Sequence, residues 1–488
     1  MGFLRRDAVA DLAQRADVPF ALLANGEWKK RGVEEITIGS AQSVESRRSF
    51  QCADLGDALG SLRPRGATHA SVVLPLTTLP KRPLLGFDVS APDRTVANLP
   101  PRGALAELEA GFVCRLADAG GIRVDDTMRL LITKICEFSP GRWTRWYPDL
   151  PYETRVAGYV ESQTGWRLAD DVVKQWLDAV APARASLADA VGLPPDPDSS
   201  AENPVLVVPL VQAVAGIGPD DVLPLLRRYA RFVERCTALD HVEPFAPHAM
   251  LAEYGRVWEV MIECTVPLDG PFIVRMSERR SLNLSGDGVA DLEVTTGDAL
   301  SNHTVVRVID ENVCLGKPDA IAIDGSPLRE DEFDSVRFTA EEVATYASGP
   351  DREYRIKMQI PLTVVGHVGA TNTVVAALTL LSIVLVLRGW SAIDAADLAV
   401  LVIPTTFAAS LAVTRERTTL ASHLMGRSRL VVLVLTTLLW VLVGAHYLGD
   451  TEVSRAGCAS ISVTPPGLAE PQDLRHERAR RCDGQEHR

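Results

Sequence analysis

The sequence predicts a membrane-anchored protein of the α+β class. A mixed helical N-terminal and middle region comes first, then a β-sandwich-like domain, then three C-terminal transmembrane helices. Three observations support this prediction: uncharged apolar runs are concentrated after residue 360, a helical apolar period runs through 102–256, and a period of two runs through 257–362. With 488 residues, of which 47% are hydrophobic, the chain can bury at least one sizeable core.

The first 101 residues are predicted to form a small α/β region. Alternating β-branched residues at 33–38 and 70–76 indicate strands. Prolines recur between these strands and the next region, which indicates tight turns.

Region 102–256 is predicted to be mostly helical. At Arg102 the apolar period changes to that of a helix, and we expect this helix to end at Gly120 because glycine commonly closes helices. Two further helical patterns follow at 168–191 and 222–239.

Residues 257–362 are predicted to form a β-sandwich-like domain beside the membrane. Segments of alternating apolar and polar residues follow one another at spacings of roughly 10–20 residues, with Gly/Asp turns such as 268–270 between them. The last segment, 354–362, leads with little linker into the first long apolar run.

Transmembrane helices are predicted at about 364–387, 395–414 and 430–448, within 363–450. The first run has 24 residues without a formal charge, about 36 Å of helix at ~1.5 Å per residue against a hydrocarbon core of roughly 30 Å. The second has an uncharged run of only 17 residues and reaches spanning length by including residues near Asp397. The alternative is that these runs are core helices of a soluble domain. Residues 451–488 are predicted to be a disordered tail.

Basic residues beside the spans predict the orientation of a multi-pass protein of the cell membrane. Seven lie before the first span or between the second and third, and two lie on the other side: Arg352, Arg355, Lys357, Arg415, Arg417, Arg427 and Arg429 against Arg388 and Arg455. We therefore expect residues 1–360 in the cytoplasm and the C-terminal tail outside.

Charge and motifs exclude several classes of function. The net charge of −13 disfavours nucleic acid as a partner, and the eight cysteines form no CxxC pair. The common nucleotide-binding, hydrolase, zinc-protease and kinase motifs are missing from the sequence. We predict no catalytic residue and no cofactor, and favour a protein that is not an enzyme.

An aromatic and arginine-rich segment, 142–166, is the best candidate for binding a protein partner. Aromatic and arginine side chains concentrate binding energy at interfaces. The candidate residues are Trp143, Arg145, Trp146, Tyr147, Tyr152 and Trp166. The alternative is an aromatic loop that closes the helical core.

Histidines suggest two weaker candidate sites. His241 and His248 lie seven positions apart and offer nitrogen ligands for a metal, although the segment between them also reads as a polar connection. His367 and Asn372 make the start of the first span polar, which indicates either an intramembrane function or a hydrated histidine at the interface.

The sequence thus favours a membrane-anchored cytoplasmic interaction or signalling-scaffold protein. Its expected partners are the lipid bilayer and a protein partner or a second copy of the chain. The alternatives are an enzyme of unrecognised class that acts on a membrane-associated substrate, and an accessory subunit of a membrane complex.

Overall fold

The computed structural model divides the chain into two compact units. The globular unit comprises Met1–Val365 and Glu416–Leu424, and the helix-bundle unit comprises Gly366–Arg415 and Met425–Arg488. The residues that the structure describes are 17–63, 66–81, 85–139, 149–192, 203–239, 246–296, 299–322, 335–348, 354–388, 395–414 and 420–459.

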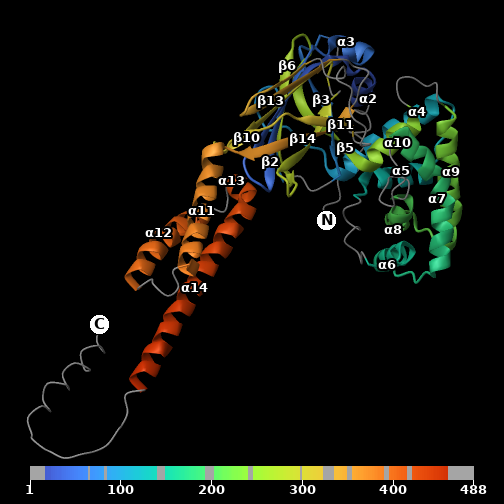
Figure 1. Cartoon of the computed structure of the whole chain (residues 1–488). Coiled ribbons are helices and arrows are strands. Elements are labelled where there is room, and N and C mark those ends of the chain that lie inside the picture. Colours follow the sequence, from blue (N-terminus) through green and yellow to red (C-terminus); the bar gives the residue numbers. More distant parts are fainter. Residues whose placement is uncertain are drawn as a thin grey trace, which may run out of the picture. The chain divides into compact units, whose positions relative to one another are not determined.

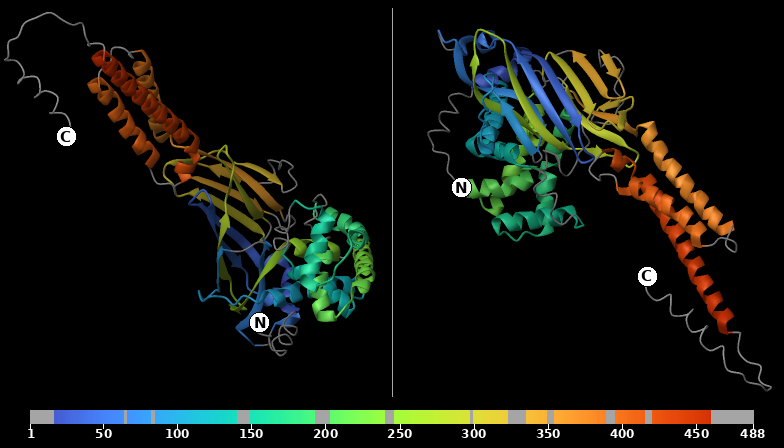
Figure 2. Two further views of the ribbon diagram at one scale, coloured as in Figure 1. Left: turned by 90° about the horizontal axis from the view of Figure 1, so that it is seen from below. Right: turned by 90° about the vertical axis from the view of Figure 1, so that its left-hand side faces the viewer.

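A seven-stranded sheet forms one layer of the globular unit (Figures 1 and 2). Its strands, in spatial order, are β12 (Ser335–Phe338), β13 (Glu342–Ser348), β9 (Ser301–Val308), β1 (Lys29–Ile38), β2 (Ser43–Cys52), β6 (Phe272–Ser281) and β4 (Leu85–Ser90). All neighbours are antiparallel except β1 and β9, which are parallel. In β2 every second residue from Val44 to Cys52 is buried, as expected for a strand with one face on a core.

Two smaller sheets pack against the inner face of this layer. One is the pair β3 (His69–Pro80) and β5 (Val257–Pro267), and the other combines β10 (Val313–Leu315), β14 (Tyr354–Val364), β8 (Val289–Thr296), β7 (Asn283–Leu284) and β11 (Asp319–Ala322). Each smaller sheet shares its own apolar cluster with the large sheet. Phe50 and Val274 pack with Leu74 in the first cluster, and Ile36 packs with Ile360 in the second.

The strands of the two sequence regions expected to be separate, 1–101 and 257–362, pair within the same sheets. β1 pairs with β9, β2 with β6, and β3 with β5. The helical region 102–256 is therefore inserted between two halves of one β assembly. Alternation shows which residues face inward, but it does not show which strand is the partner, so the sequence alone did not reveal this pairing.

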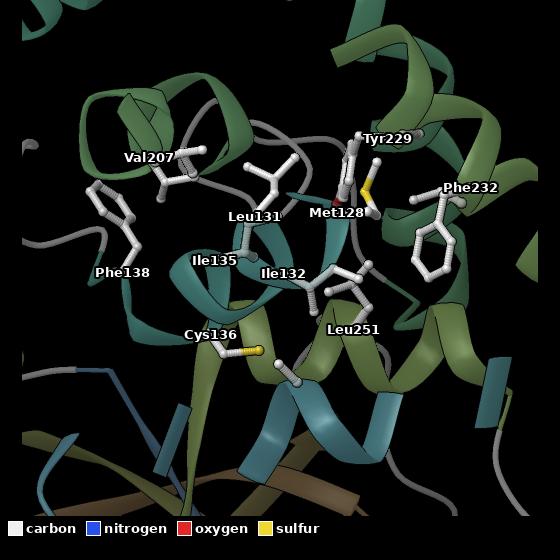
Figure 3. Close-up of a cluster of buried hydrophobic side chains, with 14 of the residues drawn as sticks. Met128, Leu131, Ile132, Ile135, Cys136, Phe138, Val207, Tyr229, Phe232 and Leu251 are labelled. Atoms are coloured by element: carbon white, nitrogen blue, oxygen red, sulfur yellow. The ribbon is translucent and has the colours of Figure 1, made fainter. Parts of the chain in front are cut away.

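The inserted region is helical, as predicted. Its helices are α4 (Arg102–Ala119), α5 (Asp126–Glu137), α6 (Tyr152–Thr164), α7 (Asp170–Ala190), α8 (Asn203–Ala215), α9 (Pro219–Thr237) and α10 (Pro247–Arg256), and two short helices, α2 (Asp17–Ala24) and α3 (Gly56–Leu59), precede them. The helix from Arg102 ends before Gly120, which confirms that prediction. Leu131 of α5 and Tyr229 of α9 lie in their shared core (Figure 3).

The helix-bundle unit contains α11 (Gly366–Arg388), α12 (Ala395–Thr414) and α14 (Gly426–Ala459), which pack against one another. Within the described residues, two helical stretches are long and apolar enough to cross a membrane, Ala370–Arg388 and Gly426–His446. The helix of the first stretch, α11, begins at Gly366 and not at 364 as predicted, because β14 continues to Val364.

The second predicted span, 395–414, forms α12, but within the described residues it is not long and apolar enough by the same measure, so two of the three expected spans meet it. Its uncharged run is too short for the hydrocarbon core, about 25 Å at ~1.5 Å per residue. A bent pair, α8 with α9, would qualify as a further span by length and composition. The apolar residues of this pair, such as Val207 and Leu226, are however already buried in the core of the helical insert.

Candidate functional site

Charged side chains lie inside the globular unit, on the inner face of the seven-stranded sheet. Glu34 of β1, Arg48 of β2, and Glu278 and Arg280 of β6 are each at most 8% exposed. They point inward because they occupy the same alternating positions as the apolar residues of their strands. Glu34 lies directly opposite Arg48 in the register.

These four residues form one ion-pair network. Arg48 Nε lies 3.1 Å and Arg280 Nη2 lies 3.3 Å from the same Glu34 oxygen, Oε1. The Ser46 hydroxyl donates to that oxygen at 2.7 Å, and Arg280 also pairs with Glu278. Burial alone would raise the pKa of Glu34, but the charge of Arg48 and then that of Arg280 hold it below its ordinary value.

The network connects all three sheets. Arg48 Nη1 donates to Thr77 Oγ1 of β3 at 2.8 Å, and Arg280 Nη1 donates to the backbone oxygen of Glu293 in β8 at 3.0 Å. The network therefore lies along the seam between the two smaller sheets, the β3–β5 pair and the sheet of β8 and β14. Removing one partner of a buried ion pair strongly destabilises the folded protein, because the other charge stays buried without compensation.

A cavity of about 360 Å³ opens at this seam, and Arg280 forms part of its wall. We call it the seam cavity. Its polar lining consists of Arg256, Arg280, Ser281, Asn283, Asp291, Glu293 and Lys357. Lys357 Nζ lies 3.1 Å from Asp291 Oδ2, and the Gln359 amide donates to the other oxygen of that carboxylate at 3.0 Å.

The charged lining of the seam cavity can interact with anionic and with cationic groups. Guanidinium groups bind carboxylates or phosphates, and carboxylates accept hydrogen bonds from ammonium groups. Within the described ranges, the structure brings together no group of three or more His, Cys, Asp or Glu side chains arranged to hold a metal ion.

Two further buried ionisable side chains, Lys81 and Glu109, connect the helical insert with the β layers. Lys81 Nζ donates to the backbone oxygen of Ile135 at 3.2 Å and to that of Cys136, at the C-terminal end of α5. The Glu109 carboxylate accepts from the backbone N–H of Glu259 in β5 at 2.9 Å. Burial raises the pKa of Glu109 to about 8 and lowers the pKa of Lys81 to about 8.

Two residues of the predicted partner-binding segment are described by the structure. Tyr152, at the start of α6, and Trp166, just after that helix, are half-buried and pack against the core of the helical insert. The other four, Trp143, Arg145, Trp146 and Tyr147, lie outside the described residues. Partner binding by this segment stays a prediction.

The histidine candidates are not brought together among the described residues. His248 lies buried on α10, and its ring atom Nδ1 has no hydrogen-bond partner in the described part of the chain, to which His241 does not belong. Asn372 is buried between α11 and α14, where its amide donates to the Ser428 hydroxyl at 3.1 Å. His367 falls in the first turn of α11, and its side chain is outside the described set.

The ion-pair network and the seam cavity were not predicted from the sequence. A signal for the network was present, because Ser46 and Arg48 share the parity of Val44 and Phe50, which marks them as inward-facing. The cavity had no such signal, since its lining comes from strands whose pairing the sequence did not reveal.

Comparison with known proteins identifies no family. No protein-family model matches the chain, and no curated protein sequence matches it. Among solved structures, native alpha-2-macroglobulin from Escherichia coli, from domain MG7 to the C-terminus, is similar at 10% identity and a TM-score of 0.11. That alignment covers 66% of this chain and 83% of the other. A likeness this weak carries no argument about fold or function.

Proposed function

We propose that this protein is a membrane-anchored cytoplasmic interaction protein, in which a bundle of helices holds the globular unit at the inner face of the membrane. The observation that carries the proposal is the outer surface of the helix bundle. Large apolar side chains on all three helices are exposed, among them Leu381 of α11, Phe407 of α12 and Val441 of α14. A surface so continuously apolar is typical of a segment surrounded by lipid.

Polar side chains of the bundle lie in its interior. Asn372, Thr379 and Thr405 are buried between or along the helices. The Thr379 hydroxyl donates to the backbone oxygen of Val375 at 2.8 Å, so its polar group is satisfied inside the bundle. Polar groups inside and apolar groups outside are what a hydrocarbon solvent requires.

Chain continuity supports α12 as a third crossing. The next segment, α13 (Leu420–Leu424), belongs to the globular unit: Leu420 is fully buried in the β core, and the N–H of Ala421 donates to Asp310 Oδ2 at 2.8 Å. If α11 crosses the membrane, the chain must cross back before Leu420. The 20 residues of α12 extend about 30 Å at ~1.5 Å per residue, so the whole helix can span when its charged N-terminal turn lies at the interface.

The chain around α13 also supports an orientation of the protein in the membrane. The segment that carries Arg415, Arg417, Arg427 and Arg429 flanks α13, so these arginines belong on the same side as the globular unit. Basic residues concentrate on the cytoplasmic side of membrane proteins. This assignment places the globular unit inside the cell and the C-terminal tail outside.

Alkaline extraction tests the anchor. We expect the full chain to remain in the membrane pellet after washing at about pH 11, as an integral protein does and a peripherally bound one does not. Release of the full chain into the supernatant would remove the basis of the proposal.

Crosslinking tests the interaction. Membrane tethering raises the effective concentration of the globular unit for partners at the inner leaflet. We expect crosslinking of the full chain in cells to yield a defined adduct that is lost in the double variant Trp143→Ala/Trp146→Ala and retained when the exposed Arg47 is changed to Ala. An adduct unaffected by the double variant would contradict partner binding by this segment.

A further inference from the structure

The seam cavity combines both signs of charge within a space the size of a small molecule. Arg256 is the last residue of α10, and Arg280 is the last but one of β6, whereas Asp291 and Glu293 come from β8 in the other sheet. A volume of about 360 Å³ lies at the lower end of the range of small-molecule sites, roughly 300–1,000 Å³.

Arg280 prevents a peptide strand from adding to the sheet at this site. Among the described residues, β7 pairs with β8 only at Ala290 and Asp291, which leaves the edge of β8 open from Leu292 onward. An added peptide strand would need the backbone groups of that edge. The Arg280 guanidinium already occupies the backbone oxygen of Glu293 at 3.0 Å, so strand addition is blocked and a compact ligand is favoured.

The charged side chains around the cavity indicate which kind of ligand it can bind. Arg280 is balanced by the buried Glu34 and Glu278, Arg256 Nη1 lies 3.8 Å from Glu253 Oε2, and Asp291 is balanced by Lys357 and by the amides of Gln359 and Asn283. A molecule that carries both signs can contact the guanidinium groups and the carboxylates of this lining together and leaves the net charge of the site unchanged, whereas an ion of a single sign contacts only one kind of group.

From this geometry we propose that the seam cavity binds an amino-acid-sized zwitterion. Its carboxylate is received by Arg256 beside Arg280, and its ammonium group is received by Glu293 beside Asp291. A free amino acid and a very short peptide share this chemistry, because each carries one carboxylate and one ammonium group. The inference does not depend on the membrane proposal, because the site lies entirely within the globular unit.

Calorimetric titration of the full chain in detergent micelles tests the proposal. The probes are L-alanine, tri-L-alanine, acetate alone and ethylammonium alone, at neutral pH. We expect saturable 1:1 binding of alanine, of the tripeptide or of both, and at least tenfold weaker binding of acetate and ethylammonium. Preference for alanine would identify the free amino acid as the source, and preference for the tripeptide would identify a peptide. No binding of either zwitterion, or acetate binding as tightly, would overturn the proposal.

Matched variants locate the binding. Glu293→Gln and Arg256→Gln each remove one charge from the lining, and each should weaken binding about tenfold or more, because a charge-assisted hydrogen bond is lost. Arg279→Gln is the control, since Arg279 neighbours Arg280 on β6 but is exposed on the other face of the sheet. Thermal unfolding checks that each variant is folded. If Arg256→Gln does not fold, the test rests on Glu293→Gln alone. Unchanged affinity in a folded Glu293→Gln variant would also overturn the proposal.

Discussion

Arg47 and Arg48 are adjacent in β2, yet their surroundings are opposite. The Arg48 side chain is 4% exposed and pairs with the buried Glu34, whereas the Arg47 side chain is 65% exposed. We expect Arg48→Met to lower the free energy of unfolding of the globular unit by about 3–5 kcal/mol, because it leaves buried carboxylates without one of their two cations.

The exposed neighbour provides the control. Arg47→Met should change the free energy of unfolding by less than about 0.5 kcal/mol. Urea unfolding of both variants, followed by tryptophan fluorescence, measures the difference. Equal losses in the two variants would show that the ion-pair network contributes little.

The buried pair Lys81 and Glu109 predicts how stability depends on pH. The pKa of Glu109 rises from its ordinary 4.5 to about 8, so the folded protein binds more protons than the unfolded chain between these values, and stability falls as pH rises through that window. The pKa of Lys81 falls from 10.5 to about 8, so its effect has the opposite sign, and stability rises between about pH 8 and pH 10.5. Arg102, Glu137 and Cys136 also face the pair.

We therefore expect the contribution of this pair to stability to be lowest near pH 8. Urea unfolding across this range checks it in the wild type and in Glu109→Gln, which keeps an acceptor for the N–H of Glu259. The variant should lose the decline between about pH 4.5 and pH 8, while Glu161→Gln, an exposed change on α6, should keep it. A decline that persists in Glu109→Gln would assign the effect to other groups.

At the scale of elements, the sequence predicted the helices and strands better than their partners. Gly120 ends the helix that starts at Arg102, and inward alternation marks β2, because both depend on local chemistry. The pairing of β2 with β6 joins residues more than two hundred positions apart, and no local pattern encodes it. The buried charges were visible in the alternation, but the cavity beside them depends on the pairing and was not.

The short helix α13 packs in the β core of the globular unit, between the sequence positions of α12 and α14. Leu420 is fully buried among residues of β8 and β14, so Leu420→Ala should lower the free energy of unfolding of the globular unit by about 2–5 kcal/mol. The same change at Leu430, which is 60% exposed on α14, should have little effect. Limited proteolysis should also become faster at 415–425 in Leu420→Ala. Unchanged stability and cleavage would mean that α13 does not dock in solution.

Across the whole molecule, the two units differ in where their apolar side chains lie. The globular unit buries its apolar side chains in three large clusters, whereas the helix bundle exposes them and buries Asn372 and Thr405. Apolar runs were readable from the sequence because hydropathy is local. The return of the chain to the β core at Leu420 was not, because it depends on tertiary packing.

Thiol labelling of intact cells with a membrane-impermeant reagent tests the proposed crossing of the membrane and its orientation. Two single-cysteine versions of the full chain are compared, one that keeps only Cys482 in the tail and one that carries only Thr418→Cys, in the segment just before α13. Three crossings with the globular unit inside predict that Cys482 is labelled in intact cells and that the cysteine at 418 is labelled only after lysis. Labelling of the cysteine at 418 in intact cells, with Cys482 protected until lysis, would contradict the account.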